Sequence, residues 1–170
     1  ETGHLEHLYY GKKLRIPGNP MQTYEAFSEK SAYAPGTTNY YDDEHKNLSL
    51  EDLCLEMSSR GRGDIREPMM EVVHEDGSTT SDFLFEKAEI LDGCLSSEIL
   101  PRAYDDAGLA KTLVVTLRDV GYGLKLELIY TMFTECDVLA KSARLYNESI
   151  RTVTVKRLLS AQLDLYDCNY

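Results

Sequence analysis

A carboxylate and a guanidinium stand two residues apart, at Asp64 and Arg66, in a segment that also carries the glycines Gly61 and Gly63. Side chains at this spacing on an extended segment point to the same side. Together they can accept and donate hydrogen bonds to the hydroxyl groups of one ligand, and the glycines allow a sharp turn or a close backbone approach. The pair therefore predicts contact with a hydroxylated ligand. The alternative is that it ties this loop to its own sheet.

Catalytic carboxylates are not indicated. A glycosidase needs two carboxyl groups about 5 to 9.5 Å apart beside a sugar-sized pocket. The adjacent acids Asp42-Asp43 and Asp105-Asp106 stand in loop sequence, and the chain has no Trp to form a sugar platform. We interpret these acids as solvated turn residues and expect no catalytic residue in this chain.

The metal-ligating residue types are dispersed. The four histidines are His4, His7, His45 and His74. Two of them close together, without a third ligand, make a poor metal site. The four cysteines, about 30 to 40 residues apart, match no zinc pattern; they are Cys54, Cys94, Cys136 and Cys168. We expect no metal, no cofactor and free thiols, with two disulfides as the alternative.

Charge and hydropathy narrow the class of protein. The formal net charge of -11 is spread along the chain, which disfavours binding to a nucleic-acid phosphate backbone. No apolar run approaches the roughly 18 to 20 residues of a membrane-spanning helix, and no leader sequence is visible. The chain begins with Glu1 rather than Met, so we expect an internal fragment or a piece cut from a longer protein. Free thiols are typical of a reducing cytoplasm, which is the expected location.

The elements that must position these residues are strands. Residues 124–132 alternate, with apolar side chains at the even positions, as in a strand with one buried face. Residues 112–118 are rich in β-branched side chains and predict a strand. The two-glycine loop 119–123 would join this strand to the one at 124–132 as a hairpin. Residues 138–146 predict a further strand, and residues 153–165 carry an apolar odd face.

The first half is less regular. Residues 68–74 and 79–90 flank an Asp76-Gly77 turn that predicts a hairpin. Residues 48–57 predict one or two helical turns, which Ser49 could cap. Residues 15–47 predict a long loop or excursion, whose tyrosines favour an interface or binding role over ordered coil; they are Tyr24, Tyr33, Tyr40 and Tyr41. Short strands with regular turns predict an all-β antiparallel sandwich or barrel.

Read in chain order, several segments resemble the N-terminal domain of the family 36 glycoside hydrolases, the α-galactosidases. They are residues 61–68, 76–78, 124–133, 142–144 and 160–165. The resemblance runs from about His4 to Tyr170. It implies an antiparallel supersandwich of the galactose-mutarotase-like kind, of which residues 1–170 form a part that is incomplete at both ends. It also implies a catalytic (β/α)8 barrel downstream.

The resemblance implies a retaining α-galactosidase that removes terminal α-linked galactose from oligosaccharides such as raffinose or melibiose. In that family two barrel aspartates do the chemistry without a cofactor, and loops of the β-domain reach towards an active site, often that of a neighbouring subunit. Asp64 and Arg66 are then the candidate substrate contacts. Ile65 stands where the family commonly carries an aromatic residue.

The partners implied are a galactose-containing oligosaccharide, the chain's own barrel and further copies in a homotetramer. One alternative is a stand-alone, non-catalytic carbohydrate-binding sandwich that uses Tyr40 and Tyr41. Another is an interaction protein of sandwich fold with no ligand.

Overall fold

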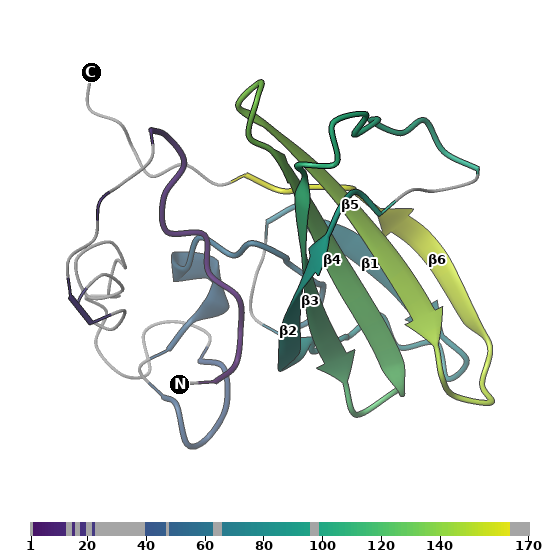
Figure 1. Ribbon diagram of the computed structural model, residues 1–170. Helices are drawn as coiled ribbons and strands as arrows, with labels where there is room; N and C mark the ends of the chain where they lie inside the picture. Colours follow the sequence, from purple (N-terminus) through teal and green to yellow (C-terminus); the bar gives the residue numbers. More distant parts are fainter. Residues whose placement is uncertain are drawn as a thin grey trace.

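The computed structural model describes residues 2–12, 15, 18–19, 22, 40–46, 48–62, 66–95 and 99–163. The elements in this part are a 3-10 turn and a series of strands (Figure 1). They are η1 (Leu50–Asp52), β1 (Met70–His74), β2 (Leu84–Asp92), β3 (Lys111–Asp119), β4 (Leu124–Phe133), β5 (Val138–Asn147) and β6 (Val153–Leu158).

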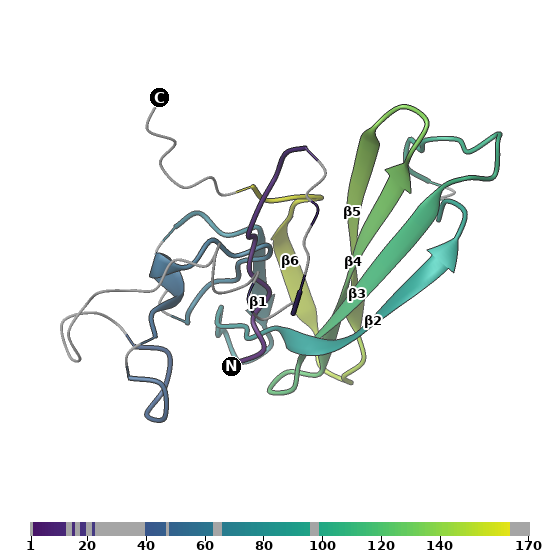
Figure 2. The ribbon, with the colours of Figure 1, turned by 60° about the vertical axis from the view of Figure 1, so that its left-hand side comes forward.

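The strands form two antiparallel layers. β2, β3, β4 and β5 follow one another in a four-stranded meander, and β1 pairs with β6 in a second sheet. Figure 2 shows the β1–β6 sheet beside the meander and facing one side of it, with the N-terminal segment running alongside β1. The predicted antiparallel β-sandwich is therefore confirmed.

The core lies between the two layers because buried apolar side chains alternate with more exposed ones along the first part of β4. Leu124, Leu126 and Leu128 are each no more than 3 % exposed and point towards the small sheet. Leu117 of β3 lies beside Leu126 in the register, on the same face. The buried residues of this core are Met57, Met69, Met70, Val72, Phe83, Val115, Leu117, Leu124, Leu126 and Leu128.

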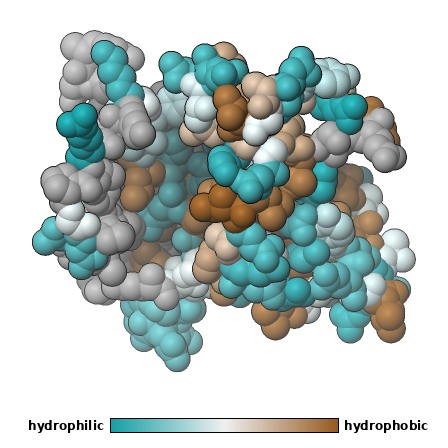
Figure 3. Space-filling view, viewed as in Figure 1, coloured by the Kyte–Doolittle hydropathy of each residue, from teal (hydrophilic) through white to brown (hydrophobic). Residues whose placement is uncertain are grey.

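The opposite face of the meander is mixed. Val114 and Ile129 are register partners and are buried, whereas Arg118 and Lys125, further along the same face, carry charge. In the view of Figure 1, hydrophobic side chains gather over the middle of the four-stranded sheet, with hydrophilic ones around them (Figure 3).

The strands predicted at 112–118, 124–132 and 138–146 are confirmed as β3, β4 and β5, each within one residue of its predicted ends. The alternation predicted over 153–165 continues as a strand only to Leu158. The backbone N–H of Leu159 then bonds to Met69 O at 3.0 Å. Residues 164–165 lie outside the described residues.

The hairpin predicted around Asp76-Gly77 is wrong. The turn itself forms, because His74 N donates to Ser78 O at 2.8 Å and Gly77 has a φ of 84°. However, β1 pairs with β6, and β2 pairs with β3. The chain crosses between the layers after the turn, where Phe83 is 2 % exposed. Burial of that side chain separates the two strands that the turn would otherwise pair.

The helical turn predicted within 48–57 is confirmed as η1, a single 3-10 turn. Ser49 is its N-cap residue, but its side chain makes no capping hydrogen bond. Most of the predicted excursion, residues 15–47, lies outside the described residues, and so do Tyr24 and Tyr33. Tyr41 is partly buried against the small cluster of Leu50, Leu53 and Leu55.

Candidate functional site

The glycine segment that begins at Gly61 lies against residues 80–82. Gly61 has a φ of 100°, and a Cβ there would lie 2.3 Å from Thr80 Oγ1 and 2.8 Å from Thr80 Cα. The backbone N–H of Ser81 donates to Arg60 O at 3.1 Å. We call residues 60–66 the glycine loop. Its start is fixed by contact of backbone with backbone, for which only glycine leaves room.

Arg66, at the other end of the glycine loop, reaches the 3-10 turn. Its Nη2 donates to Leu53 O at 2.7 Å and to Leu50 O at 3.2 Å. Arg66 therefore anchors the loop within the domain. Asp64 lies outside the described residues, so the pairing of Asp64 and Arg66 on a ligand stays a prediction.

Three segments of the chain meet at the carboxylate of Asp82. His4 Nε2 lies 3.1 Å from Asp82 Oδ1, while Tyr41 OH donates to Oδ2 at 2.8 Å. Arg62 Nη2 lies 3.0 Å from the same Oδ2 atom. The backbone N–H of Asp82 donates to Asp119 Oδ2 at 3.2 Å. We call Asp82 with His4, Tyr41 and Arg62 the Asp82 node.

The electrostatics of the Asp82 node favour an ionised carboxylate. Burial alone would raise the pKa of Asp82, but the hydrogen bonds of His4 and Tyr41 and the charge of Arg62 outweigh it and lower the pKa. Burial and the Asp82 charge raise the pKa of the Tyr41 hydroxyl, which stays a donor. The aromatic ring of Tyr41 also has Arg62 5.5 Å from its centroid and His4 edge-on at 4.8 Å.

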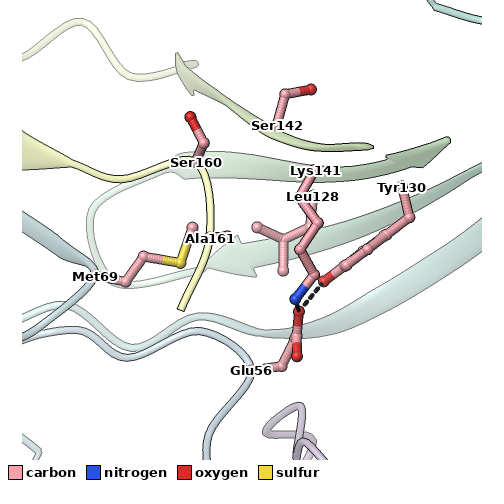
Figure 4. A pocket seen from close by; sticks show the side chains of 8 residues that line it. All are labelled: Glu56, Met69, Leu128, Tyr130, Lys141, Ser142, Ser160 and Ala161. Carbon is pink, nitrogen blue, oxygen red and sulfur yellow. Dashed lines mark hydrogen bonds and ion pairs between the residues drawn. The ribbon is translucent and has the colours of Figure 1, made fainter. Parts of the chain in front are cut away.

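A second carboxylate, Glu56, has the same kinds of partner. His7 Nδ1 lies 3.0 Å from Glu56 Oε2, and Tyr130 OH donates to Oε1 at 2.9 Å. Lys141 Nζ donates to Oε1 at 2.5 Å. Figure 4 shows the Tyr130 and Lys141 side chains converging on this carboxylate. We call Glu56 with His7, Tyr130 and Lys141 the Glu56 node; burial raises the pKa of Tyr130.

An open crevice of about 210 Å³ lies beside the Asp82 node. Its polar groups already have partners within the protein. Asp119 Oδ1 accepts from the N–H groups of Gly121 and Tyr122, and the Arg118 guanidinium binds Glu86 and Glu148. A ligand bound in the crevice would have to displace these contacts.

In each pair of adjacent acids noted in the sequence, the first aspartate stabilises a local turn. Asp42 Oδ1 accepts from the backbone N–H groups of Glu44 and His45. Asp105 accepts from those of Leu109 and Ala110. Within the part of the chain that the structure describes, no His, Cys, Asp or Glu group is arranged to hold a metal ion. Nor does a disulfide join the described cysteines Cys54, Cys94 and Cys136.

Sequence reasoning missed both nodes. His4 and Asp82 are 78 residues apart in the chain, and His7 and Glu56 are 49 apart. No local spacing links them, so the histidines looked merely scattered. Among the residues described, no helix is long and apolar enough to cross a membrane.

Residues 3–170 match the family model described as the Glycosyl hydrolase family 36 N-terminal domain. The alpha-galactosidase AgaA of Geobacillus stearothermophilus is 30% identical over 99% of this chain and 22% of that protein. The bifunctional alpha-galactosidase/sucrose kinase AgaSK of Mediterraneibacter gnavus is 32% identical over 95% of this chain and 17% of that protein.

Solved structures agree. The alpha-galactosidase from Lactobacillus brevis superposes with a TM-score of 0.87 at 31% identity, over 100% of this chain and 22% of that chain. AgaA gives a TM-score of 0.83 at 28% identity, over 96% of this chain and 22% of that chain. The chain thus spans about a fifth of the length of the relatives it matches. It belongs to the N-terminal domain family of the family 36 glycosyl hydrolases.

Proposed function

We propose that this chain is the N-terminal domain of an α-galactosidase that removes terminal α-linked galactose from oligosaccharides. The observation that carries the proposal is the family match over residues 3–170. Structures of the relative AgaA were solved in complex with stachyose and with raffinose, which supports galactose-containing oligosaccharides as the substrate class. The proposed setting is the cytoplasm.

The proposed chemistry is a retaining two-carboxylate mechanism carried out by a (β/α)8 barrel outside this chain. Such a mechanism needs a nucleophile and an acid/base about 5 to 5.5 Å apart across the scissile bond. The partly buried carboxylates Asp82 and Glu56 are enclosed by side chains of the domain itself. The buried carboxylate of Asp119 accepts from backbone N–H groups.

The role proposed for the domain is therefore support of the active site. Asp64 and Arg66, on the glycine loop, would reach the substrate, in the chain's own barrel or in that of a neighbouring copy in a homotetramer. Arg66 gives this loop a fixed base, because it bonds to two carbonyls of the 3-10 turn region. A carboxylate on such a base can accept hydrogen bonds from sugar hydroxyls.

A stand-alone carbohydrate-binding module is not favoured by any contact of the described residues. Such a module would need Tyr40 and Tyr41 as an exposed aromatic platform for a sugar. Tyr41 is partly buried, and its hydroxyl is bonded to Asp82, so it does not present a free aromatic face beside Tyr40.

The test compares the full-length protein with residues 1–170 alone, on a chromogenic α-galactoside and on raffinose. We expect hydrolysis by the full-length protein only. Asp64→Asn and Arg66→Ala in the full-length protein should each lower kcat/KM about ten- to a hundredfold, as loss of a charged hydrogen bond does. Activity of residues 1–170 that survives removal of host enzymes would contradict the proposal, and so would a full-length protein that hydrolyses no α-galactoside.

A further inference from the structure

The Asp82 and Glu56 nodes are chemically matched. Each joins one carboxylate to a histidine of the N-terminal segment, a tyrosine hydroxyl and a cation. The carboxylate side chains are 15% and 12% exposed, respectively. They differ in where the cation comes from: Lys141 belongs to β5, whereas Arg62 directly follows Gly61 in the glycine loop.

Contacts with residues 80–82 fix the start of the glycine loop. Gly61 lies against Thr80, and Arg60 O accepts from the N–H of Ser81. Arg62, whose side chain is 42% exposed, is held by Asp82. Without that carboxylate the described contacts of Arg62 reduce to the ring of Tyr41, which is itself bound to Asp82. The direction in which the loop leaves Gly61 therefore depends on Asp82.

Asp82 is itself fixed from several sides. Its backbone N–H is bonded to Asp119, and its side chain is bonded to His4 and Tyr41. Three residues further along the chain, in β2, Phe85 N donates to Gly3 O at 2.8 Å. The carboxylate is thus a rigid anchor, and Arg62 is the more exposed group that it orients.

We infer that Asp82 is a positioning residue for substrate binding: by holding Arg62 it fixes the start of the glycine loop, without touching substrate itself. The inference rests on the proposed function, because the path of the loop matters to KM only if the loop contacts the galactoside. A substitution far from the reacting atoms that displaces a substrate-binding group by about 1 Å can reduce activity about a hundredfold.

The experiment uses the full-length protein with Asp82→Asn and, as its matched control, Glu56→Gln. An amide keeps the shape of either carboxylate, but it replaces one acceptor oxygen with a donor and removes the charge. We expect both variants to lower the thermal unfolding midpoint. Only Asp82→Asn should raise KM for raffinose, by about tenfold, because only the Asp82 node includes the glycine loop.

Arg62→Ala separates positioning from folding, since this side chain is half exposed and its loss leaves the carboxylate in place. We expect it to raise KM as much as Asp82→Asn does, and the double variant to add little more, because the two residues act through one contact. If Asp82→Asn does not fold, the KM of Arg62→Ala still tests whether the contact between Asp82 and Arg62 matters for substrate binding.

The inference is overturned if Asp82→Asn shifts KM no more than Glu56→Gln does, or if the Asp82 and Arg62 effects on KM simply add. In either case an active wild-type enzyme that is impaired by Asp64→Asn leaves the proposed function standing. A wild-type protein without α-galactosidase activity, or an Asp64→Asn variant with unchanged KM and kcat, overturns the proposed function and this inference with it.

Discussion

At position 61 a side chain would meet the backbone of a neighbouring segment. A Cβ there would lie 2.8 Å from Thr80 Cα, and the φ of 100° is one that residues other than glycine rarely adopt. Two separate costs therefore fall on one substitution: strain in the backbone conformation and displacement of Thr80. Neither flanking segment can easily retreat, because Ser81 N is bonded to Arg60 O.

We expect Gly61→Ala to lower the free energy of unfolding by about 3 kcal/mol, from strain and overpacking together. Gly93→Ala is the control. Gly93 has a φ of 83° but nothing within 4 Å of its added Cβ, so it should cost only the left-handed strain of about 1 to 2 kcal/mol. Denaturant unfolding of the full-length protein measures both. Equal losses would show that contact with Thr80 does not matter.

The lowered pKa of Asp82 also predicts how the free energy of unfolding changes at acid pH. The folded protein lowers the pKa of Asp82 below its usual value of 3.8, since its hydrogen bonds and Arg62 outweigh burial. A lowered pKa contributes stability that is present above the usual value and is lost as pH falls through the folded one. The free energy of unfolding should therefore decline as the pH falls below about 4.

Asp82→Asn removes this titrating group and should flatten that part of the decline. The measurement is denaturant unfolding between pH 5 and 3 for the wild type and Asp82→Asn. Parallel curves for the two proteins would mean that the node contributes nothing to acid stability.

Among the elements, β4 carries the largest part of the packing. Leu126 is 0% exposed in the middle of this strand, with Leu117 beside it in β3 and Leu145 in β5. A fully enclosed leucine leaves a cavity when it is shortened, because close-packed neighbours relax only in part.

Leu126→Ala should lower the free energy of unfolding by about 3 to 5 kcal/mol. Val120→Ala, in the turn after β3, removes methyl groups from a side chain that is 81% exposed and should change it by less than about 0.5 kcal/mol. Denaturant unfolding of the full-length protein is again the measurement. A Leu126→Ala cost below 1 kcal/mol would show that the core between the sheets is loosely packed.

The β3–β4 hairpin could be predicted because its signals are local and agree. Alternation by two gives the strands, and the loop between them contains Gly123, which has a φ of 69°. The partner of β1 could not be predicted in the same way. The Asp76-Gly77 turn is a local signal too, but the pairing of β1 depends on β6, at the far end of the described sequence.

The site was predictable to a lesser degree. Glycine and charge in residues 61–66 mark a special loop from sequence alone. The Asp82 node combines His4, Tyr41 and Arg62 from three separate segments, and only the packed fold brings these side chains to one carboxylate. Long-range polar contacts leave no periodic pattern for sequence reasoning to detect.

On the scale of the whole molecule, considerable apolar surface is exposed in these 170 residues. Large hydrophobic side chains in the strands remain open, among them Phe85 at 50%, Ile90 at 76%, Met132 at 45% and Val155 at 49%. The small sheet has only β1 and β6 in the described part. Open strand edges and apolar patches are templates for association.

We therefore expect residues 1–170, produced alone, to self-associate. The net charge of -11 opposes this, but its repulsion is screened over about 8 Å at physiological salt. Size-exclusion chromatography at low and physiological salt, read with amide-exchange protection, provides the test. A monodisperse monomer with well-protected strands would contradict the expectation and would favour the independent binding module.

The pairing of β1 with β6 has a consequence for the order of folding. Met70 lies opposite Leu158 and His74 opposite Val153, with the entire β2–β5 meander between them in the chain. The meander needs only closures between neighbours in sequence, whereas the small sheet must close a loop that contains all of it. Pulse-labelling hydrogen exchange during refolding should therefore protect the amides of β3 and β4 before those of β1 and β6. A substitution confined to β6 should then accelerate unfolding and leave the folding rate nearly unchanged.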